Sequence, residues 1–373
     1  MFGKPIHLFR LFGFAIRLDP SWFILAVLVA WSLAARIFPF RMPGLDQSTY
    51  WTMGVIGAAA LFVSIILHEC AHAVVARRYD IPIRGITLFI FGGVAEMESE
   101  PPSAKAEFLM AGAGPLASVA LGAAGFAVIA AGLPLPAAAT GVLSYVAQIN
   151  LLLAFFNLVP AFPLDGGRML RAALWHYRKS LRSATRTASR IGSAFGLVLM
   201  GLGLLALLQQ QIISGIWFFL IGMFVRNIAK ASYQQVLLRQ ALEGEPVRRF
   251  MQGTPITVAP ELPVQELVDD YIYRYQHKLY PVVRNGTLLG CVGVDRVKSL
   301  PREEWGARTV GDIATECGID GSIHPDDDAM NALAKMRRSG QSRVLVLDQG
   351  RLVGILTLRD LLDFFALKVD LEG

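Results

Sequence analysis

Six apolar stretches, each long enough to cross a lipid bilayer, constrain this chain more than any other feature. The hydrocarbon core of a bilayer is about 30 Å thick and takes about 20 helical residues to cross. The stretches lie near residues 21–40, 52–78, 105–132, 137–159, 187–209 and 212–230. With 54% hydrophobic and 17% charged residues, the chain does not have the composition of an ordinary soluble enzyme, and we expect a multi-pass α-helical membrane protein.

The basic residues flank these stretches and indicate how the chain is oriented. They gather before the first stretch, between the second and third, and between the fourth and fifth, whereas residues 133–136 and 210–212 carry no charge. By the positive-inside rule both termini are expected in the cytoplasm, with the chain spanning the cell (inner) membrane. Because the net charge of +6 is placed at these flanks, we expect membrane lipid as a partner and no nucleic acid.

The three cysteines, Cys70, Cys291 and Cys317, are scattered along the chain. Their separations match neither the spacing of a metal site nor that of a disulfide framework. The sequence therefore implies no disulfide and no oxidising compartment.

The last 130 or so residues read as a soluble domain in which one unit is used twice. Residues 255–297 and 321–361 share a Pro-containing turn, an amphipathic helix, a strand, a glycine turn, a second strand and a closing helix. The period of about 64 residues is too long for a solenoid repeat. We expect a membrane domain over 1–232, a short helical linker over 233–246, and repeats over 247–304 and 305–367.

Two pieces of the membrane domain do not read as helix. Residues 85–98, GITLFIFGGVAEME, combine β-branched and aromatic residues with a Gly-Gly pair, which predicts a short hairpin. Residues 157–167, NLVPAFPLDGG, contain two prolines, so the fourth stretch must break or end there. Non-helical backbone at membrane depth is tolerated only where protein or a water-filled cavity covers it.

Ionisable residues stand at the end of the second apolar stretch, where HECAH holds His68, Glu69 and His72. Residues four apart share one face of a helix, so the two imidazoles converge. Histidines so placed bind zinc, and the neighbouring carboxylate can act as a general base. The same pattern occurs by chance in soluble helices. Here, however, an ionisable residue at the bilayer centre costs about 2.5–3.5 kcal/mol, which favours a functional role.

A catalytic zinc takes three protein ligands and keeps one position open. The acid that follows the proline-containing break is Asp165, next to a Gly-Gly pair. A turn aspartate is the alternative, because Asp-Gly is common in turns. The need for a cavity around this break favours Asp165 as the third ligand. The remaining histidines considered lie in basic or soluble contexts: His176, His277 and His324.

HECAH in the second stretch and NLVPAFPLDGG at 157–167 together resemble the site-2 protease family of intramembrane zinc metalloproteases. The tail resembles a pair of cystathionine-β-synthase-type (CBS) domains, so nearly the whole chain is similar to the branch of that family with cytosolic CBS domains. The resemblance implies one zinc ion per chain held by His68, His72 and Asp165, with Glu69 as the catalytic base. It also implies that Asn157 steadies the oxyanion, with a helix-capping or interhelical amide as the alternative.

The fold and activity expected from the resemblance follow. About six transmembrane helices and a small re-entrant β-hairpin would form an endopeptidase that cleaves transmembrane protein substrates in or near their spans. A cytosolic α+β CBS pair would modulate it. We expect the edge of the hairpin to hold an extended substrate by main-chain hydrogen bonds, with a packed re-entrant loop as the alternative.

The CBS pair also resembles modules that bind adenine nucleotides between two repeats. Thr357 and Asp360 match the ribose-contacting Thr-x-x-Asp spacing of such modules, whereas the first repeat has Gly293 and Arg296 at the same offsets. One nucleotide site is therefore expected rather than two. A module without a ligand, forming a homodimer or docking substrate, is the alternative.

Two rival functions belong to other classes. In a CBS-gated transporter or channel, His68, Glu69 and Asp165 would line an ion path. That function gives no reason for the helical spacing of the two histidines and the glutamate, or for the proline-containing break before Asp165. A non-catalytic membrane scaffold leaves Glu69 unexplained.

Overall fold

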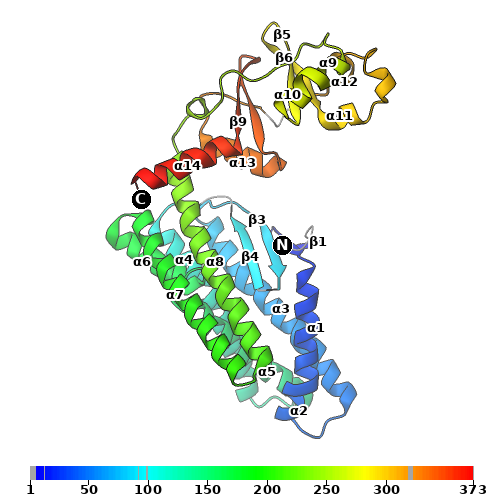
Figure 1. The fold of residues 1–373 in the computed structure, drawn as a ribbon. Helices are drawn as coiled ribbons and strands as arrows, with labels where there is room; N and C mark the ends of the chain where they lie inside the picture. The colour runs from blue at the N-terminus through cyan, green and yellow to red at the C-terminus, as the bar shows by residue number, and fades with distance from the viewer. Residues whose placement is uncertain (1–5, 12, 91, 98–99, 318–321, 373) are drawn as a thin grey trace. The chain divides into compact units, whose positions relative to one another are not determined.

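The computed structural model divides the chain into two compact units, residues 1–234 and 235–373, which Figure 1 shows as ribbons. It describes every residue except 1–5, 12, 91, 98–99, 318–321 and 373. Of the predicted hairpin 85–98, residues 91 and 98 therefore lie outside the described residues.

Within the described part of the chain, six helices are long and apolar enough to cross a membrane, which confirms the prediction. The first runs over Ser21–Arg41, as α1 (Ser21–Ser32), a π-helical turn (Leu33–Ile37) and α2 (Phe38–Arg41). The others are α3 (Gln47–Arg77), α4 (Ala104–Ala130), α5 (Ala137–Asn157), α7 (Leu181–Leu208) and α8 (Ile212–Leu242). Large apolar side chains such as Val27 and Phe155 are 68% and 67% exposed, as expected of a surface that faces lipid.

Two helix ends differ from the sequence prediction. Helix α7 begins six residues before the predicted fifth stretch, so Arg182 and Arg186 lie on the helix rather than in the preceding connection. The reason is the cap at Ser180, whose side chain accepts a hydrogen bond from the N–H of Ser183. The short helix α6 (Asp165–Arg178) precedes it. Helix α8 continues to Leu242, so most of the predicted linker 233–246 is helical.

A four-stranded sheet packs against α3, and the sequence predicts only half of it. Its order is β1 (Ile6–Leu11), β2 (Phe14–Leu18), β3 (Ile83–Phe89) and β4 (Gly92–Met97). Strands β3 and β4 pair antiparallel as the predicted hairpin, while β2 joins β3 in parallel. Strand β2 was missed; it buries Phe14, Ile16 and Leu18 in a cluster with Cys70 and Ala73 of α3, beside which Figure 1 shows the sheet. Re-entry of the hairpin into the membrane stays a prediction.

The second unit contains one five-stranded sheet, ordered β5-β6-β9-β8-β7, that both repeats build. The elements of the first repeat are α9 (Val264–Glu266), a π-helical turn (Leu267–Ile272), α10 (Tyr273–Tyr275), β5 (Leu279–Arg284), β6 (Thr287–Gly293) and α11 (Val294–Lys298). Those of the second are α12 (Val310–Ile313), β7 (Ser322–Ile323), α13 (Ala329–Ser339), β8 (Arg343–Asp348), β9 (Arg351–Thr357) and α14 (Leu358–Glu372). Short 3-10 turns at Val247–Arg249 and Arg302–Glu304 complete the unit. The unit has one apolar core at β5 and β6 and another at β8 and β9, and Leu242 at the end of α8 belongs to the latter.

The prediction that no cysteines pair is wrong. Cys291 on β6 is bonded to Cys317, 26 residues further along the chain, and Cys70 is free and buried. The two sulfurs meet because the backbone of Cys291 exchanges hydrogen bonds with that of Thr315, at 2.8 and 3.0 Å. This non-local pairing places Cys317 beside β6, and cysteine spacing alone does not contain it.

Candidate metal centre

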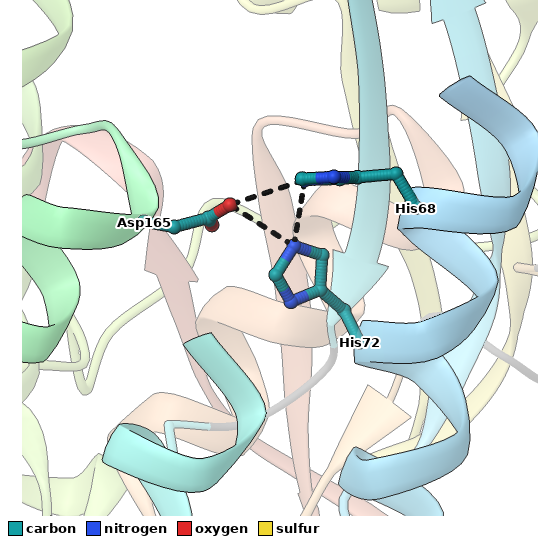
Figure 2. A group of neighbouring side chains, drawn as sticks. All are labelled: His68, His72 and Asp165. Carbon is teal, nitrogen blue, oxygen red and sulfur yellow. Dashed lines mark hydrogen bonds and ion pairs between the residues drawn. The ribbon is translucent and has the colours of Figure 1, made fainter. Parts of the chain in front are cut away.

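His68 and His72 lie one turn apart on α3 and turn their imidazoles to the same side, as Figure 2 shows. Their Nε2 atoms are 3.2 Å apart, and the two residues are only 4% and 7% exposed. Cys70 and Ala73, on another side of the same turns, pack against the sheet. The sheet therefore holds the stretch of α3 that carries the histidines.

Asp165 faces both imidazoles from the first residue of α6 (Figure 2). The helix starts tightly against the preceding proline-containing segment. A Cβ added at Gly166 would lie 2.2 Å from the Leu158 carbonyl oxygen, and one added at Gly167 would lie 2.2 Å from the Phe162 nitrogen. The Gly-Gly pair is therefore required for this close packing, which fixes where the first residue of α6 points.

Three potential ligand atoms converge at this point. Oδ2 of Asp165 lies 3.1 Å from Nε2 of His68 and 3.2 Å from Nε2 of His72. Ligands of a tetrahedral zinc ion sit at about 2.0–2.2 Å from the metal, so two of them are separated by about 3.3 Å. Two imidazoles and one carboxylate are also a donor set typical of catalytic zinc. The cluster His68, His72 and Asp165 can therefore hold a metal ion, and it fits zinc.

Helix α4 holds the outer nitrogens of both rings. Nδ1 of His72 lies 2.6 Å from the carbonyl oxygen of Met110, and Nδ1 of His68 lies 2.9 Å from the hydroxyl of Ser118. Because a carbonyl only accepts, Nδ1 of His72 carries the proton and donates it, which leaves the lone pair of Nε2 directed at the cluster. Such contacts fix the tautomer and orientation of metal-binding histidines. The sequence reasoning missed both.

Gly114 lies on α4 directly against the two imidazoles. An added Cβ there would be 2.2 Å from Nε2 of His72 and 2.5 Å from Nε2 of His68. Met110, Gly114 and Ser118 are spaced four apart, so they share one face of the helix. The spacing predicts that the three share a face, but it does not indicate what that face contacts.

Glu69 follows His68 on α3 and is half-buried. It lies against β4, since a Cβ added at Gly93 would be 2.7 Å from Cγ of Glu69. Strand β4 ends the sheet. The structure thus brings the candidate base and the edge strand together.

Asn157 is the last residue of α5. Its Nδ2 donates a hydrogen bond of 3.0 Å to the carbonyl of Leu153 in the same helix. This contact is neither a helix cap nor a bond between helices, so both readings of Asn157 stay predictions. An amide nitrogen carries two hydrogens, so one remains for another acceptor.

Thr357 and Asp360 lie where β9 passes into α14. Oδ2 of Asp360 accepts from the N–H and the hydroxyl of Thr357, at 2.8 and 2.6 Å, and Oδ1 accepts from Nε2 of Gln252 at 3.1 Å. This is the pattern of a helix N-terminal cap, which gives the Thr-x-x-Asp spacing a structural reason. A cavity of about 230 Å³ lies elsewhere in this unit, lined in part by Cys291 and Arg343 but by neither residue of the pair.

The six bilayer-length helices of the described residues, together with the buried His-His-Asp cluster, define an intramembrane metalloenzyme. The sequence model of peptidase family M50 matches residues 56–138 and 134–199, which include all three cluster residues. The CBS domain model matches residues 247–301 and 310–367. The chain belongs to peptidase family M50, in a form that carries a CBS pair.

Two relatives span nearly its full length. Rip3 of Mycobacterium tuberculosis, provisionally named a zinc metalloprotease, is 34% identical over 359 residues, which are 95% of this chain and 91% of that protein. A zinc metalloprotease of Methanocaldococcus jannaschii is 31% identical over 363 residues, covering 96% and 95%. A solved site-2 protease from the latter organism is 31% identical, covers 61% of this chain and 94% of its own, and gives a TM-score of 0.44.

The family matches and relatives confirm the predicted family and activity. The protein is an intramembrane zinc metalloprotease with a C-terminal CBS pair. Nothing in these comparisons supports the transporter alternative.

Proposed function

We propose specific roles for five residues in this zinc endopeptidase. One zinc ion per chain is held by His68, His72 and Asp165. Glu69 is the catalytic base, and Asn157 stabilises the oxyanion. The observation that carries the proposal is the convergence of three buried donor atoms at 3.1–3.2 Å, next to Glu69 on the same helix.

The chemistry follows from these positions. Zinc bound here supplies a Lewis acid that polarises the scissile carbonyl and acidifies water. Glu69 takes a proton from the attacking water and passes it to the nitrogen of the leaving amine. Nδ2 of Asn157 donates its second hydrogen, the one not bonded to the Leu153 carbonyl, to the oxyanion. In other enzymes a contact of this type stabilises the transition state by about 2.7–4 kcal/mol.

The substrate is a transmembrane segment of a membrane protein, surrounded by lipid. Its helix must unwind before attack, because helical carbonyls are occupied by the helix's own hydrogen bonds. We propose that β4 holds the extended segment by main-chain hydrogen bonds. Two features support this: β4 is the edge of the sheet, and Gly93 of β4 touches Glu69.

Metal removal tests the proposal. Purified full-length protein in lipid vesicles is expected to contain about one zinc ion per chain, the number of a single catalytic site, and to cleave a co-reconstituted transmembrane substrate. Chelation with 1,10-phenanthroline should abolish cleavage, and added zinc should restore it, with the helical circular dichroism signal unchanged as the control. Undiminished cleavage by zinc-free protein would contradict the proposal, and absence of tightly held zinc would favour a non-enzymatic function.

We propose that both termini lie in the cytoplasm, with the membrane domain over 1–232, the linker over 233–246 and the CBS repeats over 247–304 and 305–367. The distribution of basic residues supports this orientation. Reporter fusions should place residues 180 and 250 in the cytoplasm and residue 135 outside. A cytoplasmic signal at residue 135 would reverse the assignment.

We propose that an adenine nucleotide bound at Thr357 and Asp360 modulates proteolysis. Asp360→Ala should weaken the binding of ATP or AMP to the full-length protein, measured by isothermal calorimetry, and should reduce any nucleotide-dependent change in cleavage rate. Because Asp360 also caps α14, the change should lower stability by about 0.5–2 kcal/mol.

The matched control for this change is Asp328→Ala. Asp328 caps α13 in the same unit by accepting from the N–H of Met330, so the control should lower stability similarly and leave nucleotide binding intact. If the wild type binds no adenine nucleotide, the CBS pair is instead a homodimerisation or substrate-docking module.

A further inference from the structure

We propose that a buried ion pair between Glu107 on α4 and Arg171 on α6 positions the third zinc ligand, an inference that rests on the zinc site proposed above. Nε of Arg171 donates to Oε1 of Glu107 at 2.6 Å. The two side chains are 4% and 0% exposed. Nη2 of Arg171 also lies 3.2 Å from Oε2 of the partly exposed Glu100.

Helix packing alone does not explain this pair. Replacing a buried ion pair by apolar side chains of similar volume is often neutral or stabilising, because both charges must leave water. The pair here is also incompletely satisfied, since Oε2 of Glu107 has no hydrogen-bond partner among the described residues. Because such a pair contributes little net stability, we explain its presence by the relative position of α4 and α6 that it fixes.

Arg171 fixes the segment that presents Asp165. It lies on α6 six residues after Asp165. Its guanidinium also lies over the ring of Phe162, 5.2 Å from the centroid, and Phe162 belongs to the segment that leads into α6. The Arg171 side chain therefore contacts the segment before Asp165 and also bonds α6, which begins at Asp165, to α4.

The same face of α4 contacts the other two ligands. Glu107, Met110, Gly114 and Ser118 are separated by three, four and four residues, which places them on one face. Met110 and Ser118 bond the outer nitrogens of His72 and His68. Helix α4 is thus a common support for all three ligands, two by direct contact and Asp165 through Arg171.

The test compares zinc affinity in four full-length variants: Arg171→Met, Glu107→Gln, the double variant carrying both, and Arg171→Lys. Zinc affinity is measured by competition with a chelating dye, and coordination by the visible absorption of the cobalt-substituted protein. Arg171→Met, Glu107→Gln and the double variant should bind zinc about 10–100-fold more weakly, the range for residues that orient ligands, with an altered cobalt spectrum. Arg171→Lys, which keeps the charge, should lose less.

The double variant separates positioning from stability. It removes both charges of the buried pair, leaves only the partly exposed Glu100 without its partner, and should recover most of the thermal stability that the single variants lose. Asn150→Ala is the control; it removes another buried contact between helices, from Nδ2 of Asn150 to the hydroxyl of Ser64 at 2.9 Å. It should lower the unfolding temperature without changing zinc affinity. If the double variant kept the zinc affinity and cobalt spectrum of the wild type, the positioning role of the ion pair would be wrong but the zinc site would stand. If the wild type bound no zinc, the zinc site would be wrong as well.

Discussion

Glu69→Gln is expected to abolish cleavage while the protein keeps its zinc, whereas Asp165→Ala is expected to lose both. Gln has nearly the shape of Glu but cannot accept a proton, and removing a general base typically lowers the rate by about 100–10,000-fold. Asp165 supplies one of the three converging donor atoms, so its removal leaves two imidazoles to hold the ion. Zinc content by mass spectrometry and cleavage of a reconstituted substrate measure the two effects separately.

The control for both is Asp46→Ala. Asp46 caps the other end of α3, where its side chain accepts from the N–H of Thr49. The loss of this cap should lower stability by about 0.5–2 kcal/mol but should change neither zinc content nor cleavage beyond that effect. Full activity in Asp165→Ala would show that another acid completes the site, and loss of zinc in Glu69→Gln would make Glu69 a ligand rather than the base.

Gly114→Ala is expected to displace zinc although it adds a single methyl group. The new Cβ would lie 2.2 Å from Nε2 of His72 and 2.5 Å from Nε2 of His68, far inside contact distance. The rings cannot yield freely, because Met110 and Ser118 hold their outer nitrogens. We expect zinc affinity to fall by at least about 100-fold, the upper part of the range for contacts that orient ligands.

Gly112→Ala is the matched control two residues away on the same helix. Its added Cβ would meet only the end of Met169, at 3.8 Å, which is an ordinary contact. Since Ala is about 1 kcal/mol more favourable than Gly inside a helix, the control should keep its zinc and be no less stable. Equal zinc binding by the two variants would mean that the rings move aside, and that Gly114 serves helix packing only.

The sequence predicts those parts of the protein that local rules decide. Lipid demands a minimum helix length, so the six spans could be placed, and the four-residue spacing of His68 and His72 puts both rings on one side of a helix. Asp165 could be proposed because a proline-containing break at membrane depth needs a cavity around it. The structure brings this acid to the two histidines, although it shares no local pattern with them.

What the sequence reasoning missed depends on contacts between distant segments. Strand β2 pairs with β3 although α3 lies between them in the sequence. The disulfide between Cys291 and Cys317 depends on a backbone pairing that the spacing of the cysteines does not encode. The face of α4 behind the cluster was missed for a different reason. Met110, Gly114 and Ser118 are each unremarkable in an apolar helix, and their role is apparent only from the side chains opposite them.

The position of the histidines along α3 determines at what depth in the membrane a substrate is cut, and therefore where its two fragments remain. His68 lies nine residues before Arg77, the last residue of the helix, which is about 14 Å at 1.5 Å per residue. With the proposed orientation, α3 ends at the cytoplasmic surface, so the bond would be cut in the inner half of the bilayer. The cytoplasmic fragment would keep only a short apolar segment, too short to anchor it in the bilayer, and would be released into the cytoplasm. The other fragment would keep the longer part of the span and stay in the membrane.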